Sequence, residues 1–314
     1  MDGLAPFLGP TWVEAGQTIA QAASAVVRGQ LSAILARRDG TLAGEDPEEL
    51  HQMRVACRRL RTAVGLFRRW LPEGAERLRE EAGWLGSVLG PVRDADVQME
   101  SLRGLQPSLP EDVRPGGEAF LGWISAARAE AFRRIRSELT SDRWARFADL
   151  ATSALPLSGF SDAPPVEEAG AEVIRKRYRR VRRLVRALEP NQPDEAFHAS
   201  RIAAKKARYA MEFLAPVFGP DSRGCAKRLA DLQDHLGLLQ DRAVARSWLR
   251  RAKSDLPEHA FALGFLAGWF EAEGRALKQG VRDRWRPVRE AWRRLERQLP
   301  EPEERPPEPP EGPV

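Results

Sequence analysis

The stretch HQMRVACRRLR (residues 51–61) decides the fold of this chain, because its pattern returns as HASRIAAKKAR (residues 198–208). A histidine opens each copy, and basic residues follow at the same offsets. The second histidine comes 147 residues after the first. The matched positions are His51, Arg54, Val55, Arg58, Arg59 and Arg61 in the first copy and His198, Arg201, Ile202, Lys205, Lys206 and Arg208 in the second. We call these two stretches the basic strips, and their agreement predicts two equivalent segments.

The repeat continues beyond the basic strips at the same spacing of 147 residues. LGSVLGPVRDADV begins at Leu85 and LQDHLGLLQDRAV begins at Leu232, so that Asp94 is matched to Asp241. Val27-Arg28 is matched to Ile174-Arg175 in the same way. A period of this length predicts an internal duplication in which each half has about 150 residues.

The fold class predicted is all-α: two four-helix bundles related by the internal duplication as a pseudo-two-fold pair. Leu, Ala, Arg and Glu are abundant, and alternating runs of β-branched residues are missing. Clusters of Pro, Gly and Asp separate the helical patterns. We expect helices over 11–38, 47–71, 73–104, 117–155 (with a break at Thr140–Asp142), 166–188, 194–214, 222–253 and 257–298. The expected first bundle is 11–155, the second is 166–298, and 299–314 form a disordered tail.

Charge and composition narrow the function classes. The net charge is +5, but Pro300–Val314 holds five Glu and one Arg, so the rest of the chain carries +9. Cys57 and Cys225 are too few for a disulfide framework or a zinc site. No signal-peptide pattern and no apolar run of about 18 residues is found in the sequence. We therefore expect a cytoplasmic protein without a membrane partner.

Each basic strip forms one face of an amphipathic helix. With a helical advance of about 100° per residue, Arg54, Arg58 and Arg61 lie within roughly 80° of His51. The apolar residues of the first strip and its continuation lie on the opposite side: Ala56, Leu60, Ala63, Val64 and Phe67. In the second copy, His198, Arg201, Lys205 and Arg208 form the cationic face, opposite Ala203, Ala207, Ala210, Met211 and Leu214.

These helices lack the acids that normally balance a cationic face. Residues 51–71 contain six Arg and no acid, and residues 196–211 contain no acid. The segment IRKRYRRVRRLVRAL (174–188) has eight basic residues and no acid. On it, Arg175, Arg179, Arg182 and Arg186 form a single stripe. Like charges at helical spacing repel by a few tenths of a kcal/mol per pair, which indicates that an anion supplies the missing charge.

The length of the strips indicates what kind of anion this is. A stripe from His51 to Arg61 is about 15 Å long, too long for a single phosphate group. The planar fork of arginine suits phosphate oxygens. Two facing stripes favour a long, flexible polyanion held by many modest contacts. No nucleophile motif, P-loop or Mg²⁺ carboxylate cluster is found, so no cofactor, metal or catalytic residue is expected.

His51 and His198 allow more than one role. They are interpreted here as rings that donate to phosphate, although a helix-start histidine that bonds to the backbone gives the same pattern. A metal site is disfavoured, because the neighbouring cations repel a metal ion and no carboxylate completes a ligand set. Asp94 and Asp241 either hold an arginine of a strip in its binding position or form ion pairs elsewhere.

With these paired motifs, residues 11–298 resemble the CHAD domain, the conserved histidine α-helical domain. The resemblance implies a basic channel between the two bundles that binds inorganic polyphosphate. Many members of this family carry a triphosphate tunnel enzyme on the same chain, but no E-x-E-x-K strand motif occurs here. The resemblance therefore implies a non-enzymatic binding protein associated with polyphosphate granules. The implied binding residues are His51, Arg54, Arg58, Arg59, Arg61, His198, Arg201, Lys205, Lys206 and Arg208, with Arg28, Arg175 and Arg179 as further candidates.

Two other functions stay open at this point. A nucleic-acid binder would also use a basic helical surface, but single-strand binders usually place aromatic rings among the charges. Here Tyr209 is the main aromatic residue on the cationic side. A phosphohydrolase is the third possibility, and the missing metal carboxylates disfavour it.

Overall fold

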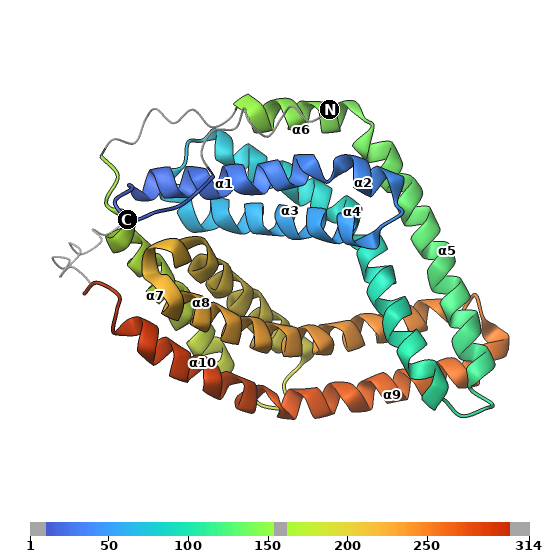
Figure 1. The fold of residues 1–314 in the computed structure, drawn as a ribbon. Coiled ribbons are helices and arrows are strands. Elements are labelled where there is room, and N and C mark those ends of the chain that lie inside the picture. Colours follow the sequence, from blue (N-terminus) through green and yellow to red (C-terminus); the bar gives the residue numbers. More distant parts are fainter. Residues whose placement is uncertain (1–10, 154–161, 302–314) are drawn as a thin grey trace, which may run out of the picture.

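The computed structural model describes residues 11–153 and 162–301. Within these ranges the chain forms helices and no β-strand, apart from one isolated bridge, so the all-α prediction is confirmed (Figure 1). The helices are α1 (Ile19–Ala36), α2 (Arg38–Ala43), α3 (Pro47–Phe67), α4 (Gly74–Leu105), α5 (Arg114–Leu139), α6 (Asp142–Ser153), α7 (Val166–Arg186), α8 (Asp194–Ala252), α9 (Ala260–Gln279) and α10 (Val281–Glu296). Three short 3-10 helices are η2 (Arg68–Trp70), η3 (Gln106–Ser108) and η4 (Pro257–His259).

The break expected between the helices at 194–214 and 222–253 lies at Gly219, whose φ of 69° and ψ of −155° are not helical, so α8 consists of two helical parts that meet at a kink. Glycine accepts this left-handed φ without a steric penalty. The segment expected as one helix over 257–298 divides instead into η4, α9 and α10. Gly280 separates α9 from α10, and the His235 ring lies 2.7 Å from the Leu277 carbonyl near the end of α9.

The two halves meet reciprocally where α1 and α7 begin. The amide of Ile19 donates to the Pro164 carbonyl, and the amide of Val166 donates to the Gln17 carbonyl, both at 2.9 Å. Each pair of matched positions is 147 residues apart, as in the repeat. Reciprocal contacts are the pattern that a two-fold axis requires. The internal duplication itself stays a prediction.

The apolar cores are shared between the halves. The larger core joins α1, α3 and the first part of α4 to α7, α8 and α10. The smaller core lies where the tip of the α4–α5 hairpin meets the tip of the α8–α9 hairpin (Figure 1). The division into bundles at 11–155 and 166–298 therefore stays a prediction. Of the expected tail, Leu299 is buried in the larger core, while residues 302–314 lie outside the described residues.

The segment Ile19–Ala43 is long and apolar enough to cross a membrane by length and composition alone. In the structure, 56% of its most apolar window is buried. Ile19, Val27, Leu31 and Ile34 of α1 have no exposed surface. Burial in the larger core explains why α1 is so apolar.

Candidate anion-binding site

The first basic strip lies on α3, and residues at the start of this helix fix where it begins. Pro47 occupies its first turn, where a missing amide proton is tolerated, and the Asp46 side chain accepts from the Glu48 amide at 2.8 Å. The apolar side of α3 is buried, as the periodicity predicts: Met53, Ala56, Leu60, Ala63, Val64 and Phe67 belong to the larger core. Packing on one side leaves the cationic side of α3 outside the core.

The second basic strip lies on α8, which packs against α3. The Arg58 Nε donates to the Tyr209 hydroxyl of α8 at 3.0 Å. Charges from Arg54 and Arg58 lower the pKa values of Arg201 and Lys205, after the larger effect of burial. The structure therefore brings the cationic faces of the two strips into one electrostatic cluster.

A concave basic surface runs along this cluster, and we call it the basic cleft. It consists of two adjoining cavities of about 460 and 700 Å³ that share Arg177, Ile202 and Lys206. Glu76 is the single acid among its lining residues, all of which belong to the described part of the chain, and it pairs with Arg79. The cationic lining residues are Arg58, Arg61, Arg68, Arg79, Lys176, Arg177, Arg179, Arg180, Arg183, Lys205 and Lys206.

Most of these cations have no carboxylate partner. Across residues 11–153 and 162–301, Arg58, Arg61, Arg177, Lys205 and Lys206 form no ion pair within 4.0 Å. Burial, followed by the charges of Arg58 and Arg201, lowers the pKa of Lys205 to about 7. The ordinary pKa value for lysine is 10.5. Burial and the neighbouring cations together therefore leave Lys205 only partly charged at neutral pH.

Arg59 and Arg208 occupy different surroundings from the rest of the strips. Both pair with Glu212 of α8, and the Arg59 guanidinium also lies over the rings of Tyr209 and Phe213 at 4.9 and 4.8 Å. Neither arginine lines the basic cleft. Glu212 lies one residue beyond the acid-free window 196–211 and one helical turn after Arg208, so the window did not include it.

Two matched aspartates interact with matched arginines beside the cleft. Arg54 Nη2 lies 3.4 Å from Asp94 Oδ1 of α4. The charge of Asp241 raises the pKa of Arg201, although burial lowers it overall. Burial raises the pKa of Asp241 itself. The contact with Arg54 supports the interpretation that Asp94 positions an arginine of a strip. Asp241 acts on Arg201 through its charge, and no ion pair joins them among the described residues, so its positioning role stays a prediction.

The two histidines lie beside the cleft without lining it. The Nδ1 atom of His51 is buried and has no hydrogen-bond partner among the described residues. Burial, and then the charge of Arg93, lowers the pKa of His51. The Nδ1 atom of His198 lies 2.7 Å from Gln240 Oε1. The ring of His198 is thus fixed by a side chain of α8, and its role toward phosphate stays a prediction.

The three further candidates have separate positions. Arg28 is buried in α1, with 2% of its surface exposed, so it does not present a cation to the cleft. Arg175, in the middle of α7, donates to the backbone carbonyls of Leu299 and Pro300. Only Arg179 lines the basic cleft.

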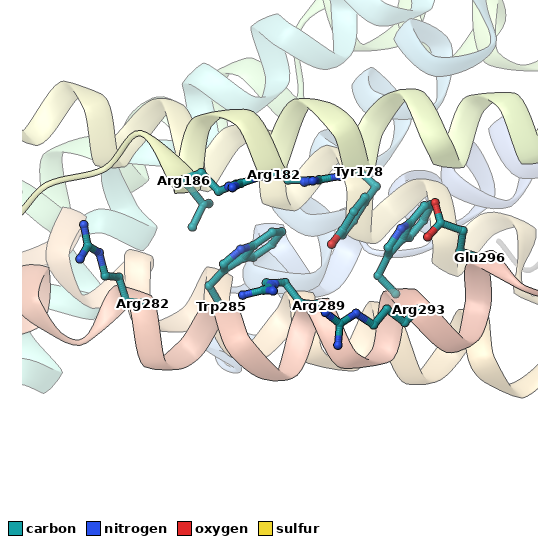
Figure 2. Close-up of a pocket in the computed structure, with 10 residues that line it drawn as sticks. Tyr178, Arg182, Arg186, Arg282, Trp285, Arg289, Arg293 and Glu296 are labelled. Atoms are coloured by element: carbon teal, nitrogen blue, oxygen red, sulfur yellow. The ribbon is translucent and has the colours of Figure 1, made fainter.

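The predicted stripe on α7 is divided between two surfaces. Arg179 faces the cleft, whereas Arg182 and Arg186 face α10 (Figure 2). Cations that the sequence-based list omitted take their place in the cleft, above all Arg177 of α7 and Arg79 of α4. The acid-free run 174–188 indicated that Arg177 belongs to an anion-binding surface. Helical periodicity alone did not show which side of α7 packs against α8, and so did not single out Arg177.

Metal-ligating groups do not gather in the described part of the chain. Over residues 11–153 and 162–301, no three His, Cys, Asp or Glu side chains lie together as a metal site requires. Both cysteines are buried as free thiols.

Comparison with known proteins gives a consistent family. The CHAD domain model matches residues 25–250. The crystal structure of the CHAD domain from the plant Ricinus communis is 25% identical, with a TM-score of 0.73 over 87% of this chain and 93% of that chain. PptA from Streptomyces chartreusis shares the fold at 21% identity, with a TM-score of 0.67 over 88% of this chain and 100% of that chain.

Curated relatives are found in two strains of Mycobacterium tuberculosis. Each is described as an uncharacterized protein and is 32% identical to this chain over 238 residues. The match covers 70% of this chain and 44% of the relative. The chain therefore spans less than half the length of these relatives.

Proposed function

The chain belongs to the CHAD domain family, and from that membership and its basic cleft we propose that it binds inorganic polyphosphate without cleaving it. The observation that carries the proposal is the set of cleft cations without carboxylate partners, among which Lys205 has a pKa lowered to about 7. A linear anion with a charge on every repeating unit supplies the missing charge along the whole cleft. Such binding releases counterions and is therefore strongly dependent on salt.

The shape of the cleft also favours a narrow, flexible chain. Its two cavities adjoin along α8 and together contain cations from α3, α4, α7 and α8. Each charge-assisted hydrogen bond contributes about 1.5–3 kcal/mol at best, so affinity comes from many contacts made together. On this proposal the protein is recruited to polyphosphate granules in the cytoplasm.

Nucleic acid is the weaker alternative, because the cleft offers no ring face for a base. Tyr209, which directly follows the second strip, has no exposed surface, and the guanidinium groups of Arg59 and Arg208 lie over its ring. Base stacking on aromatic side chains is a main source of single-strand affinity. We therefore expect polyphosphate to win over single-stranded DNA of matched charge.

A competition titration tests the proposal. Long-chain polyphosphate and single-stranded DNA of equal total charge compete for the protein at two salt concentrations. We expect polyphosphate to displace DNA at both. Displacement of polyphosphate by DNA contradicts the proposal, and release of free phosphate during long incubation with Mg²⁺ contradicts its non-catalytic part.

A charge-reversal pair tests the location. Arg58→Glu with Lys205→Glu should abolish polyphosphate binding, since it reverses two neighbouring cations that line the cleft from α3 and α8. The control is Arg250→Glu with Arg284→Glu, which makes the same change in net charge at exposed positions outside the cleft. Equal loss of affinity in both variants, with unchanged circular dichroism, would exclude the cleft as the site.

A further inference from the structure

A second cationic cavity lies between α7 and α10, and we call it the α7–α10 groove. Its volume is about 480 Å³. It shares no lining residue with the basic cleft. Arg182 and Arg186 line it from α7, and Arg289 and Arg293 line it from α10 (Figure 2). In each helix the two arginines are one turn apart, so the groove has a row of cations along both sides.

Several arginines of α10 pair with carboxylates. Arg286 pairs with Glu290 at 3.3 Å, and Arg294 lies 4.0 Å from Asp221 of α8. Among the described residues, Arg182, Arg186, Arg289 and Arg293 form no ion pair. The groove is also lined by Arg282, which pairs with Glu189 at 2.6 Å, and by the carboxylate of Glu296. The four unpaired arginines outnumber this one acid, so the groove keeps a net positive charge.

The floor of the groove is a rigid aromatic stack. The Tyr178 ring stacks on Trp292 at 3.8 Å and on Trp285 at 5.8 Å between centroids. These three rings are 3%, 5% and 6% exposed, so their faces are covered by one another and by the protein. A nucleobase finds no free face for stacking here. The apolar floor also weakens solvent screening, which strengthens the attraction of an anion to the arginines above it.

The floor also contains neutral hydrogen-bond donors. The Trp285 indole Nε1 has no acceptor among the described residues, and because it is buried, a ligand reaches it only if the Trp285 side chain shifts. The Tyr178 hydroxyl points toward the space between the helices (Figure 2). Burial raises its pKa to about 12, so it keeps its proton at neutral pH. Cations above and donors below suit a ligand that is rich in oxygen acceptors.

We infer that the α7–α10 groove is a second, independent site that binds a short linear chain of phosphates. It shares the ligand chemistry of the proposed function but uses different residues. Inorganic triphosphate, the end of a longer polyphosphate and the triphosphate of a nucleotide all have this chemistry. Because the ring faces are covered, the base of a nucleotide adds no affinity, and the groove binds inorganic triphosphate at least as tightly as ATP.

The test counts bound inorganic triphosphate by isothermal titration calorimetry on the full chain. The groove variant, Arg182→Glu with Arg289→Glu, reverses two charges of the α7–α10 groove. The cleft variant, Arg58→Glu with Lys205→Glu, reverses two charges of the basic cleft. The control, Arg250→Glu with Arg284→Glu, makes the same change in net charge outside both sites. If circular dichroism shows that the groove variant does not fold, Arg182→Gln with Arg289→Gln replaces it. We expect the groove variant to bind one triphosphate fewer than the control, and the cleft variant to keep one site with tryptophan fluorescence that still responds to triphosphate.

Each outcome separates the two proposals. Equal stoichiometry in the groove variant and the control overturns the groove site, and so does a cleft variant that binds no triphosphate. A groove variant that binds none, beside a cleft variant that still binds one, leaves the groove intact and overturns the proposed function of the cleft. ATP binding to the cleft variant at least tenfold tighter than inorganic triphosphate would show that the groove recognises a nucleotide instead.

Discussion

At the scale of single residues, neighbouring carboxylates distinguish binding cations from structural ones. Arg61 and Lys205 line the basic cleft without an ion pair in the described part of the chain. Arg59, which is adjacent in sequence to Arg58, instead pairs with Glu212 and covers two aromatic rings. Residues of the same type in one strip therefore contribute to different properties.

Arg61→Ala and Arg59→Ala should affect different measurements. Arg61→Ala removes a cleft contact, so polyphosphate affinity should fall about fivefold, equivalent to roughly 1 kcal/mol, while stability stays nearly unchanged. Arg59→Ala leaves Glu212 with one partner fewer, so the free energy of unfolding should fall by about 1–2 kcal/mol with little change in affinity. Urea unfolding and a binding titration measure the two effects, and the reverse pattern would contradict the assignment.

Lys205 should make polyphosphate binding depend on pH. Its pKa in the free protein is about 7, and a bound polyanion raises that pKa toward the ordinary range. Binding therefore takes up a proton above pH 7, and affinity should fall by up to about tenfold per pH unit as pH rises above 7. Lys205→Arg stays charged throughout and should remove most of this slope. An unchanged slope in Lys205→Arg would assign the titration to another group.

The same lowered pKa should destabilise the free protein below neutral pH. Between pH 7 and the pKa of Lys205 in the unfolded chain, the unfolded chain binds a proton at Lys205 that the folded chain lacks. The free energy of unfolding therefore rises with pH over this window, and below pH 7 the folded protein carries the full cost of a buried, charged Lys205. Lys205→Met removes this penalty and should raise the Tm at pH 6 by about 2–4 °C for each kcal/mol gained. Calorimetry with Lys227→Met as an exposed control measures the effect, and a lower Tm for Lys205→Met would contradict it.

At the scale of elements, the bend in α8 positions the second strip. Gly219 has a φ of 69°, and the two parts of α8 leave it in different directions, so that the strip packs beside α3 and the later part joins the smaller core. A side chain at this φ is strained even though a Cβ would meet no atom within 4 Å.

Gly219→Ala should therefore destabilise the protein by about 1 kcal/mol or more, since alanine disfavours the left-handed φ. Gly224→Ala is the matched control: it lies in a regular part of α8, and a Cβ there meets no atom within 4 Å. That substitution should stabilise by about 0.5–1 kcal/mol. Urea unfolding of both variants measures the difference, and equal effects would show that the bend carries no strain at Gly219.

At the scale of the whole molecule, the cationic surfaces surround α7. The basic cleft lies on the side of α7 that faces α8, and the α7–α10 groove lies on the side that faces α10. A protein with two such sites can hold one long phosphate chain at two points. The contacts then act together, because the second contact forms at a high effective concentration.

Salt dependence should report the number of cations in contact. The logarithm of polyphosphate affinity should fall linearly with the logarithm of salt concentration, since bound cations displace counterions. Arg61→Ala with Lys206→Ala should reduce the magnitude of that slope by about two. The control, Arg250→Ala with Arg284→Ala, should leave it unchanged. Slopes that fall equally in both variants would indicate a general effect of net charge.

The helical class, the approximate positions of most helices and the cationic side of each basic strip were predictable from the sequence. Periodicity determines which residues share one side of a helix, and Pro and Gly mark where a helix ends or bends, as at Gly219. The pairing of Asp94 with Arg54 was also within reach, because the repeat places it at a matched position.

Only the tertiary structure decided which neighbour covers each side of a helix. Arg59 and Arg208 are balanced by Glu212, Arg28 is buried, and Arg182 faces α10 instead of the cleft. Arg79 and Arg177 enter the cleft from helices outside the basic strips. The physical reason is that charge balance depends on distances through space between helices, whereas sequence spacing reports only the angle around one helix axis.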